Sequence, residues 1–332
     1  MIKEKYMKSN QSNSIASTIF LSVVVVALSC ALSAGSHAQT QSESESAKSS
    51  QPSQKAFASP EQAADALIEA TDQFDVPSLL QMFGPGGEDL VASADPVADK
   101  KASVAFAAKA HEKKSVEIDP KNPNRAILVV GSEEWPFPIP MVKRNGKWYF
   151  DTRAGHQEVL ARRIGANELD AITICRGYAE AQLEYASQIH DNSVVFQYAQ
   201  RVISTPGKQD GLAWQSADGN WEGPVGEAVA KALADGYAAK KPFHGYYFKL
   251  LEGQGPAARL GTLNYFIEGV MIGGFAIVGW PADYRVTGVQ TFIVSYDGVV
   301  YQRDLGPDTP KIAAAMERYN PDKTWHSTND NW

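Results

Sequence analysis

Histidines are the side chains of this sequence best suited to metal binding or proton transfer. Six occur: His37, His111, His156, His190, His244 and His326. A metal pair on one helix or strand needs ligands two or four residues apart, and no two of these histidines have that spacing. We therefore predict no metal site, no cofactor and no catalytic residues.

Two short motifs imitate ligand-binding loops. In residues 218–223, Asp218, Asn220 and Glu222 have the spacing of the first ligands of a calcium-binding loop. The position that needs a bidentate glutamate is Val229, so we predict a polar turn rather than a calcium site. Gly253, Gly255 and Ala258 imitate a dinucleotide fingerprint, but Pro256 and the lack of a following helix predict a loop between antiparallel strands. No nucleophile elbow and no phosphate loop occur.

The remaining reactive or charged candidates have simple structural interpretations. Cys175 falls in an apolar helical pattern, which favours a buried, inert thiol over a nucleophile. Arg162 and Arg163, with Glu158 and Glu168 close in sequence, form either an anion site or, as we favour, a solvated helix face or ion-pair set.

The N-terminus has the order of a secretory signal. Three lysines precede an apolar stretch over residues 19–32, and Ser36-His37-Ala38 is a small-x-small cleavage triplet. We predict a signal peptide over residues 1–38 and a periplasmic or extracellular location. Two alternatives stay open: an uncleaved membrane anchor, or a lipidated Cys30 after a lipobox-like Ala27-Leu28-Ser29.

Composition limits the remaining chain to a globular, acidic protein. Cleavage would change the formal charge from −7 to −9, because the removed segment carries three lysines and one glutamate. An acidic surface argues against nucleic acid and anionic membranes as partners, so membrane contact is expected only through the N-terminus. Residues 39–56 are almost wholly polar and predict a disordered spacer.

The next part, residues 57–153, predicts an N-terminal α+β domain. A first helix is predicted after a capping box formed by Ser59, Pro60 and Gln62. A second helix is predicted over residues 76–83 and a third over 96–113. The residues of the third helix expected to be buried are Val97, Val104, Phe106 and Ala108. Strand patterns follow at 115–118, 126–131, 137–142 and 148–151. Asn145-Gly146 between the last two is a strong hairpin signal.

A C-terminal α+β domain is predicted over residues 154–332. A short helix over 155–164 leads to a long helix, capped by Asn167, whose buried stripe is Ile172, Cys175, Ala179, Leu183 and Ala186. Shorter helices are expected at 193–203, 225–237 and 310–319, with a turn at Pro206-Gly207.

An antiparallel sheet ends the predicted fold. Residues 246–251, 275–280, 289–295 and 299–303 are aromatic and β-branched runs bounded by turn residues, and Asp297-Gly298 predicts a tight hairpin between the last two. Because a strand presents alternate residues to one face, we expect Phe292 and Val294 to face the long helix.

Several of these stretches resemble a family of secreted bacterial proteins called domain of unknown function 2950. The resemblance covers roughly residues 57–319 and is most specific at 135–138, 146–151, 162–168 and the final sheet. That family name implies no activity, so no functional residue is carried over.

The long helix and final sheet also look like the head domain of type IV pilins and pseudopilins. The chain departs from pilins because another domain separates its N-terminal apolar segment from this helix, and because it lacks their cleavage site. From these features we expect a non-catalytic binding or envelope-associated interaction module, whose partner could be another envelope protein. The alternative is a hydrolase-type enzyme with a cleft between the two domains.

Overall fold

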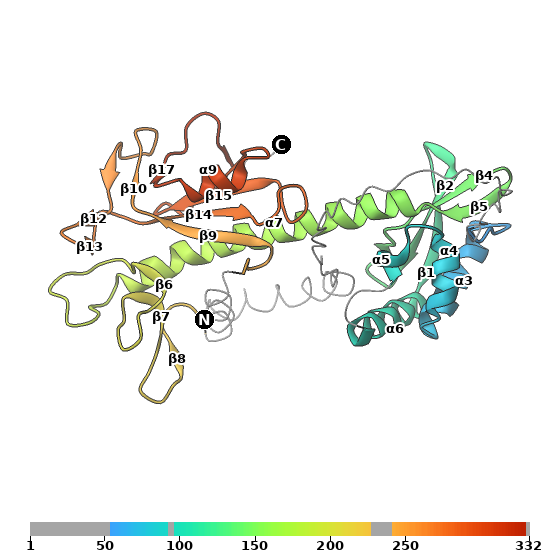
Figure 1. Cartoon of the computed structure of the whole chain (residues 1–332), viewed down its shortest axis with the longest axis horizontal. Coiled ribbons are helices and arrows are strands. Elements are labelled where there is room, and N and C mark those ends of the chain that lie inside the picture. The colour runs from blue at the N-terminus through green and yellow to red at the C-terminus, as the bar shows by residue number, and fades with distance from the viewer. Residues whose placement is uncertain (1–53, 92–95, 227–240, 330–332) are drawn as a thin grey trace, which may run out of the picture. The chain divides into compact units, whose positions relative to one another are not determined.

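The fold is α+β, as the sequence predicts. A computed structural model describes residues 54–91, 96–226 and 241–329, which divide into two compact units, one up to Leu160 and one from Ala161 (Figure 1). The predicted signal peptide, Cys30 and residues 39–53 of the predicted spacer lie outside the described residues. Among those that are described, no helix has the length and apolar character needed to cross a membrane.

The described part of the first unit begins with the helices α3 (Pro60–Asp72), α4 (Val76–Phe83), α5 (Glu88–Val91) and α6 (Pro96–Glu112). The predicted cap is confirmed, because the Ser59 hydroxyl accepts a hydrogen bond from the Gln62 N–H. The Gln62 side chain in turn accepts from the Ala58 N–H at 3.2 Å, so the first turn of α3 is held from both sides.

These helices pack on an antiparallel sheet of β1 (Lys114–Asp119), β2 (Asn122–Val130), β3 (Trp135–Pro136), β4 (Met141–Arg144) and β5 (Lys147–Phe150). The strand order is β1-β2-β4-β5, with β3 paired to β2. Asn145 and Gly146 both have positive φ, 51° and 77°, as the predicted tight hairpin requires. The predicted strand over 137–142 begins later, at Met141.

The burial predicted for α6 is wrong at three of four positions. Phe106 is buried, whereas Val97 is 81% exposed, Val104 is 44% exposed and Ala108 is exposed. Phe106 packs against Phe137, with ring centroids 5.2 Å apart. The buried face of α6 is therefore formed by Phe106 together with the small residues Ala107 and Ala110, and its valines lie on the surface.

A single long helix, α7 (Thr152–Tyr185), replaces the predicted pair of helices. Asn167 is therefore not a helix cap: it lies within α7 and its side-chain amide donates to the Thr287 carbonyl at 2.8 Å. The adjacent Gly245 has φ +75°, and a Cβ there would come within 2.6 Å of the Asn167 amide nitrogen. Asn167 thus contacts two loops distant in sequence, a role that local capping rules do not reveal.

The second unit is built on an antiparallel sheet of order β18-β16-β15-β14-β9. Its strands are β9 (Tyr246–Leu251), β14 (Ala276–Pro281), β15 (Gln290–Ser295), β16 (Tyr301–Asp304) and β18 (His326–Ser327). The four predicted strands are confirmed within two residues at each end. Gly298, at the predicted hairpin, has φ +70°, and its N–H donates to the Ser295 carbonyl.

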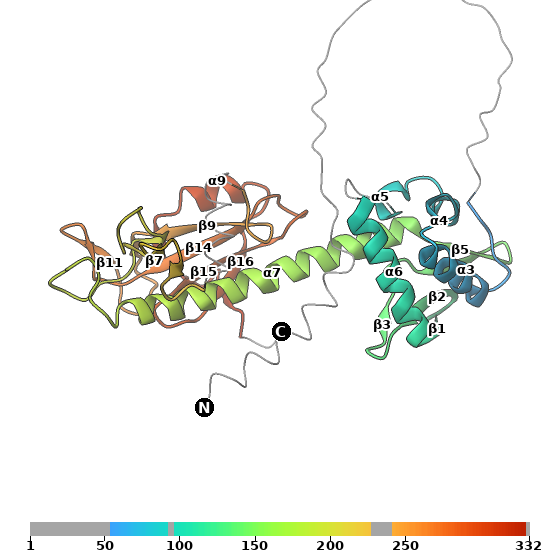
Figure 2. The same ribbon diagram turned by 90° about the horizontal axis from the view of Figure 1, so that it is seen from below.

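Helix α7 and the short α9 (Thr309–Ala314) lie on opposite faces of this sheet (Figures 1 and 2). Val294 pairs with Ile277 and Phe292 with Gly279, so these side chains share one face. Phe275 lies two residues before Ile277 on that face, and its ring packs against Tyr178 of α7. Phe292 and Val294 therefore face α7, as predicted.

The buried stripe predicted for α7 is wrong at its end. Leu183 is 51% exposed, and Ile172 and Ala186 are only half-buried, whereas Cys175 and Ala179 are buried. The buried face is instead formed by Ala171, Cys175, Tyr178, Ala179, Ala181, Gln182 and Tyr185. Gln182 is polar but satisfied: its side chain bonds both the N–H and the carbonyl of Ala199.

Small strand pairs complete the second unit. β6 (Arg201–Ile203), β7 (Gly211–Gln215) and β8 (Trp221–Glu222) form one sheet, and β10 (Gly253–Gln254), β11 (Leu263–Asn264) and β17 (Arg318–Tyr319) another, while β12 (Phe266–Ile267) and β13 (Val270–Met271) form a hairpin.

Two predicted helices of this region differ from the structure. Residues 193–200 are a loop rather than a helix, and the last helix ends at Ala314. The helix predicted over 225–237 lies outside the described residues beyond Gly226. The turn at Pro206-Gly207 is confirmed, since Gly207 has φ +78° and Lys208 N–H donates to Thr205 O.

Candidate functional site

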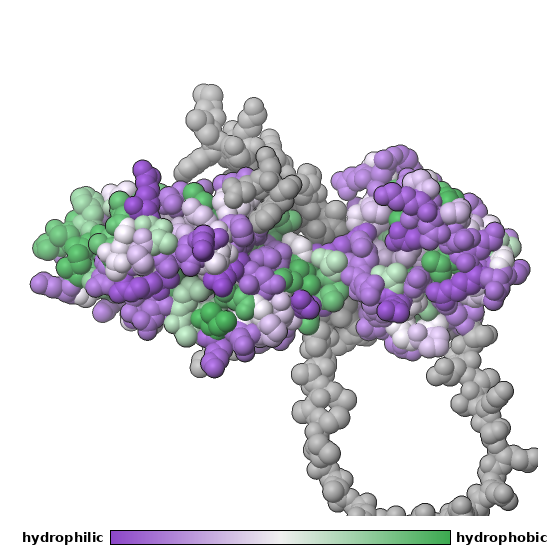
Figure 3. All heavy atoms as spheres, turned by 90° about the horizontal axis from the view of Figure 1, so that it is seen from above, coloured by the Kyte–Doolittle hydropathy of each residue, from purple (hydrophilic) through white to green (hydrophobic). Residues whose placement is uncertain are grey.

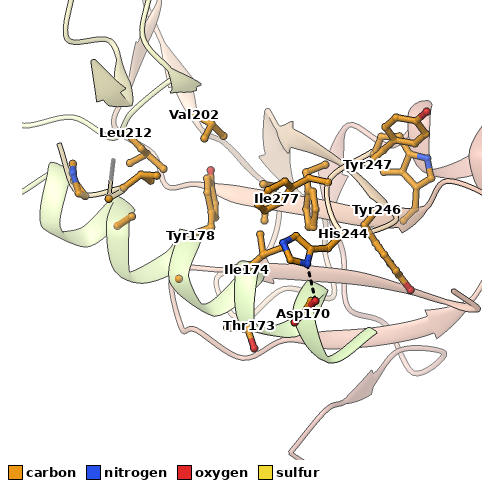
Figure 4. A pocket seen from close by; sticks show the side chains of 18 of the residues that line it. Asp170, Thr173, Ile174, Tyr178, Val202, Leu212, His244, Tyr246, Tyr247 and Ile277 are labelled. Atoms are coloured by element: carbon orange, nitrogen blue, oxygen red, sulfur yellow. Dashed lines mark hydrogen bonds and ion pairs between the residues drawn. The ribbon is translucent and has the colours of Figure 1, made fainter. Parts of the chain in front are cut away.

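A cavity of about 630 Å³ lies in the second unit, between α7 and the β9–β14 part of the sheet (Figure 4). Its walls are mainly apolar and aromatic, with Tyr178 from α7, Leu212 from β7, and Tyr246 and Ile277 from the sheet. All of its described lining residues belong to the second unit.

Helix α7 supplies one side of the cavity along a single face. Its lining residues are Asp170, Thr173, Ile174, Gly177, Tyr178 and Ala181. They recur every three or four positions, so they follow one another along the helix axis. With a rise of about 1.5 Å per residue, the wall from Asp170 to Ala181 is roughly 16 Å long. The cavity is therefore elongated along α7.

The tyrosine hydroxyls at this site have protein partners. The Tyr246 hydroxyl donates to the Gln290 carbonyl at 2.9 Å, and burial raises its pKa far above the usual value. The Tyr178 hydroxyl accepts from the Gln182 amide at 3.0 Å. Both rings thus act as fixed walls whose polar atoms point to other protein groups.

One histidine reaches the cavity. His244 Nδ1 lies 2.7 Å from Oδ2 of Asp170, which is 74 positions earlier in the chain. Both residues line the cavity, and both side chains are about half exposed. Histidine spacing could not reveal this pair because its second member is an aspartate on another element.

The backbone at His244 forms a tight turn. His244 has φ +49° and Gly245 φ +75°, and Phe243 and Tyr246 exchange both backbone hydrogen bonds across them. Two central residues with positive φ between bonded neighbours form a hairpin turn of the I′ type, which leads into β9. The turn places the His244 ring against α7.

The other described histidines lie apart from this cavity. His111 pairs with Asp72 at 3.5 Å, and His156 Nε2 lies 2.6 Å from the Gly86 carbonyl oxygen. His190 is buried and stacked on Tyr185, while His326 lies on β18. Within the described ranges no group of three His, Cys, Asp or Glu residues could hold a metal ion. His37 lies outside those ranges.

Cys175 is a buried core residue, as its sequence context predicts. It is fully buried, and this burial raises the pKa of its thiol to about 12. A thiolate is therefore not accessible at neutral pH, which excludes the nucleophilic interpretation.

Glu168 has a structural role that the sequence did not show. One carboxylate oxygen accepts hydrogen bonds from the N–H groups of Val289 and Gln290, at 2.8 and 2.9 Å. The Glu168 carboxylate is thus hydrogen-bonded to the backbone at the start of β15. Arg162 and Arg163, which were grouped with Glu168 in the sequence, do not line the described cavity. The grouping of these residues as an anion site gains no support from the structure.

The first imitation motif is a polar turn, as predicted, whereas the second begins in a strand where a loop was predicted. Residues 216–220 form the turn between β7 and β8, where Gly219 has φ +79° and the Glu222 carboxylate accepts from the Trp214 indole. Gly253 lies in β10, where a Cβ would come within 2.6 Å of the Leu263 carbonyl oxygen, so glycine is required there for close strand packing.

An exposed apolar patch is a separate feature of the second unit. Val194 and Phe196 in a loop and Ile267 at the β12–β13 hairpin are largely exposed. The two segments are adjacent, since the Tyr198 N–H donates to the Met271 carbonyl at 2.8 Å. Figure 3 shows apolar side chains gathered toward this end of the unit.

Comparison with known proteins identifies a family. A model of the family described as "Protein of unknown function (DUF2950)" matches residues 54–328. No curated protein and no solved structure matches the chain. The resemblance to this family is confirmed, and the likeness to a pilin head stays a prediction.

Proposed function

The chain belongs to the family described as protein of unknown function DUF2950, and because that description assigns no activity, we propose a function from the cavity. The protein is an extracytoplasmic binding module that holds an apolar ligand against α7. The N-terminal signal pattern supports the location. The cavity between α7 and β9–β14 supports ligand binding.

The size and walls of the cavity favour a small apolar ligand. Ligand pockets in proteins are roughly 300–1,000 Å³ and combine apolar walls with a few converging polar groups. This cavity has a volume of about 630 Å³, and its apolar walls include Ile174, Leu212 and Ile277. Removing apolar ligand surface from water at these walls supplies the driving force for binding.

Gly177 offers a direct test of the proposal. It lines the cavity, and a Cβ at this position would meet no atom within 4 Å. Gly177→Phe should therefore fill the cavity without a clash, and it replaces a poor helix former. The uncharged fluorescent probe N-phenyl-1-naphthylamine should brighten with the wild-type protein and lose that response with Gly177→Phe.

Gly165 provides the matched control. It lies on the same helix, a Cβ there also meets no atom within 4 Å, and it does not line the cavity. Gly165→Phe should keep the wild-type fluorescence response. Equal probe binding by both variants would contradict the proposal, because the probe would then bind elsewhere, for instance at the exposed patch around Phe196.

A hydrolase is the second candidate function, and the His244–Asp170 pair is the observation that favours it. A carboxylate that orients an imidazole is the arrangement of a general base. The described residues that line the cavity include no serine or cysteine that could act as a nucleophile. The Thr173 hydroxyl also lines the cavity, but it donates its hydrogen bond to the Leu169 carbonyl oxygen. Cleavage of a long-chain alkyl ester that His244→Asn abolishes would establish this activity.

A further inference from the structure

We propose that the His244–Asp170 pair selects ligands with a hydrogen-bond donor, such as a hydroxyl group, at the end of an alkyl chain. This inference rests on the proposed function, since it assumes that the cavity binds an apolar ligand. The ligand class is then an amphipathic alcohol, with its chain along α7 and its hydroxyl at His244.

The turn itself does not explain why a histidine occupies position 244. A I′ turn needs residues that tolerate positive φ, and asparagine and glycine fill that need more often. Histidine also tolerates positive φ, so it fits this turn without being required by it. The Asp170 carboxylate on α7 gives the ring a fixed orientation at the cavity wall.

Asp170 determines which ring nitrogen carries the proton. An ionised carboxylate can only accept hydrogen bonds, so the 2.7 Å contact makes His244 Nδ1 the donor. In the neutral imidazole the other nitrogen, Nε2, is then an acceptor. Figure 4 shows the bonded nitrogen directed to Asp170 and the other nitrogen on the opposite side of the ring, on the side where Ile174 and Tyr178 lie.

Nε2 is an unused acceptor at this wall. Among the described residues it has no hydrogen-bond partner, whereas the hydroxyls of Thr173, Tyr178 and Tyr246 are all engaged. A ligand hydroxyl can donate to Nε2, while an ether oxygen cannot, because two acceptors do not pair.

The shape of the cavity points to an alkyl chain as the rest of the ligand. The α7 wall runs for roughly 16 Å from Asp170 to Ala181 at the helical rise. Beyond the polar pair it is lined by Ile174, Gly177 and Ala181 on α7 and by Leu212 on β7. Lys241 also lines the cavity, so it is the α7 wall that is apolar beyond the polar pair, and a chain with a single polar end matches that wall.

The test compares 1-decanol with its methyl ether as competitors of the bound naphthylamine probe. The assay uses mildly alkaline buffer, because the acceptor form of an imidazole is the neutral one. The ratio of the two affinities should fall about fivefold in His244→Asn, the change that loss of one hydrogen bond of average strength produces. Asparagine keeps the turn because it tolerates positive φ.

Two further variants separate the role of each group. In Asp170→Asn the asparagine amide can donate to Nδ1, which places the imidazole proton on Nε2, as in catalytic triads with this substitution. Nε2 is then no longer an acceptor, so this variant should also reduce the preference for the alcohol. Thr173→Val removes a lining hydroxyl that already donates to Leu169 O, and it should leave the ratio unchanged.

An unchanged ratio in His244→Asn would overturn the inference, and an unchanged ratio in Asp170→Asn would overturn the role of Asp170. Failure of the binding proposal looks different. In that case neither competitor displaces the probe from the wild-type protein, or Gly177→Phe binds the probe as well as Gly165→Phe does.

Discussion

The sheets of the two units differ in how many of their faces are covered. In the first unit the edge strand β1 is mostly exposed along its length, and its neighbour β2 is buried only toward its end. In the second unit β14 is buried at every position, and β15 at all but its first. The second sheet has helix α7 on one face and α9 on the other (Figures 1 and 2).

The cores of the two units also differ in their buried polar contacts. The core of the first unit is largely apolar and contains the aromatic group Phe57, Phe83, Phe106, Phe137 and Phe150. In the second unit buried polar groups need internal partners: Ser295 donates to the Phe275 carbonyl at 2.7 Å, and the Tyr265 hydroxyl bonds Gln254. The second unit therefore depends on polar contacts as well as on apolar packing.

The largest expected effect concerns a side chain in the middle of the second sheet. Phe292 is fully buried, so Phe292→Ala should lower the free energy of unfolding of this unit by about 3–5 kcal/mol. Ile118→Ala, on the exposed β1 strand, should change that of the first unit by only about 0.5 kcal/mol. Hydrogen exchange of peptides from each unit measures the two effects separately. Similar losses in both units would contradict the difference between the sheets.

An intermediate effect is expected from Glu168. Glu168→Ala leaves the N–H groups of Val289 and Gln290 without their carboxylate partner, so the second unit should lose about 1–3 kcal/mol. Glu168→Gln keeps an acceptor oxygen at the same place and should lose less, since only the charge assistance is removed. Urea unfolding monitored by tryptophan fluorescence can rank the three proteins. Equal losses in both variants would mean that the charge, rather than the acceptor, determines stability.

Local sequence patterns predicted the elements whose signals are local. The Ser59 cap and the turn at Asn145-Gly146 depend on two to four neighbouring residues, and the structure confirms them. At Asp297-Gly298 a turn is present, but only Gly298 has positive φ, and the connection from Ser295 to Tyr301 is longer than the tight hairpin predicted. The strands of the second sheet also follow their pattern, because apolar runs bounded by turns are typical of buried strands.

Features that depend on distant contacts could not be predicted in this way. Asn167 looked like a helix cap because asparagine favours that position, whereas its true partner, Thr287, is 120 residues away. The pairing of His244 with Asp170 likewise joins a turn to a helix. Residue types alone did not show that either contact would form.

The smallest effect is expected at Leu183, where the helical pattern predicted burial. An aspartate in a buried stripe would unfold the unit, but Leu183 is 51% exposed, so Leu183→Asp should change the free energy of unfolding by only about 0.5 kcal/mol. Cys175→Asp, on the fully buried side of the same helix, should instead unfold the unit, because it buries an unpaired charge. Thermal unfolding of both variants measures this contrast.

The reason for the small effect at Leu183 lies in the neighbouring residue. Gln182 occupies the buried position, because its side chain both donates to and accepts from the backbone of Ala199. Hydropathy assigns a glutamine to the surface, and so the pattern moved the stripe by one residue onto Leu183. A large loss of stability in Leu183→Asp would contradict this account. The polar contacts of the second unit thus determine even which face of α7 is buried.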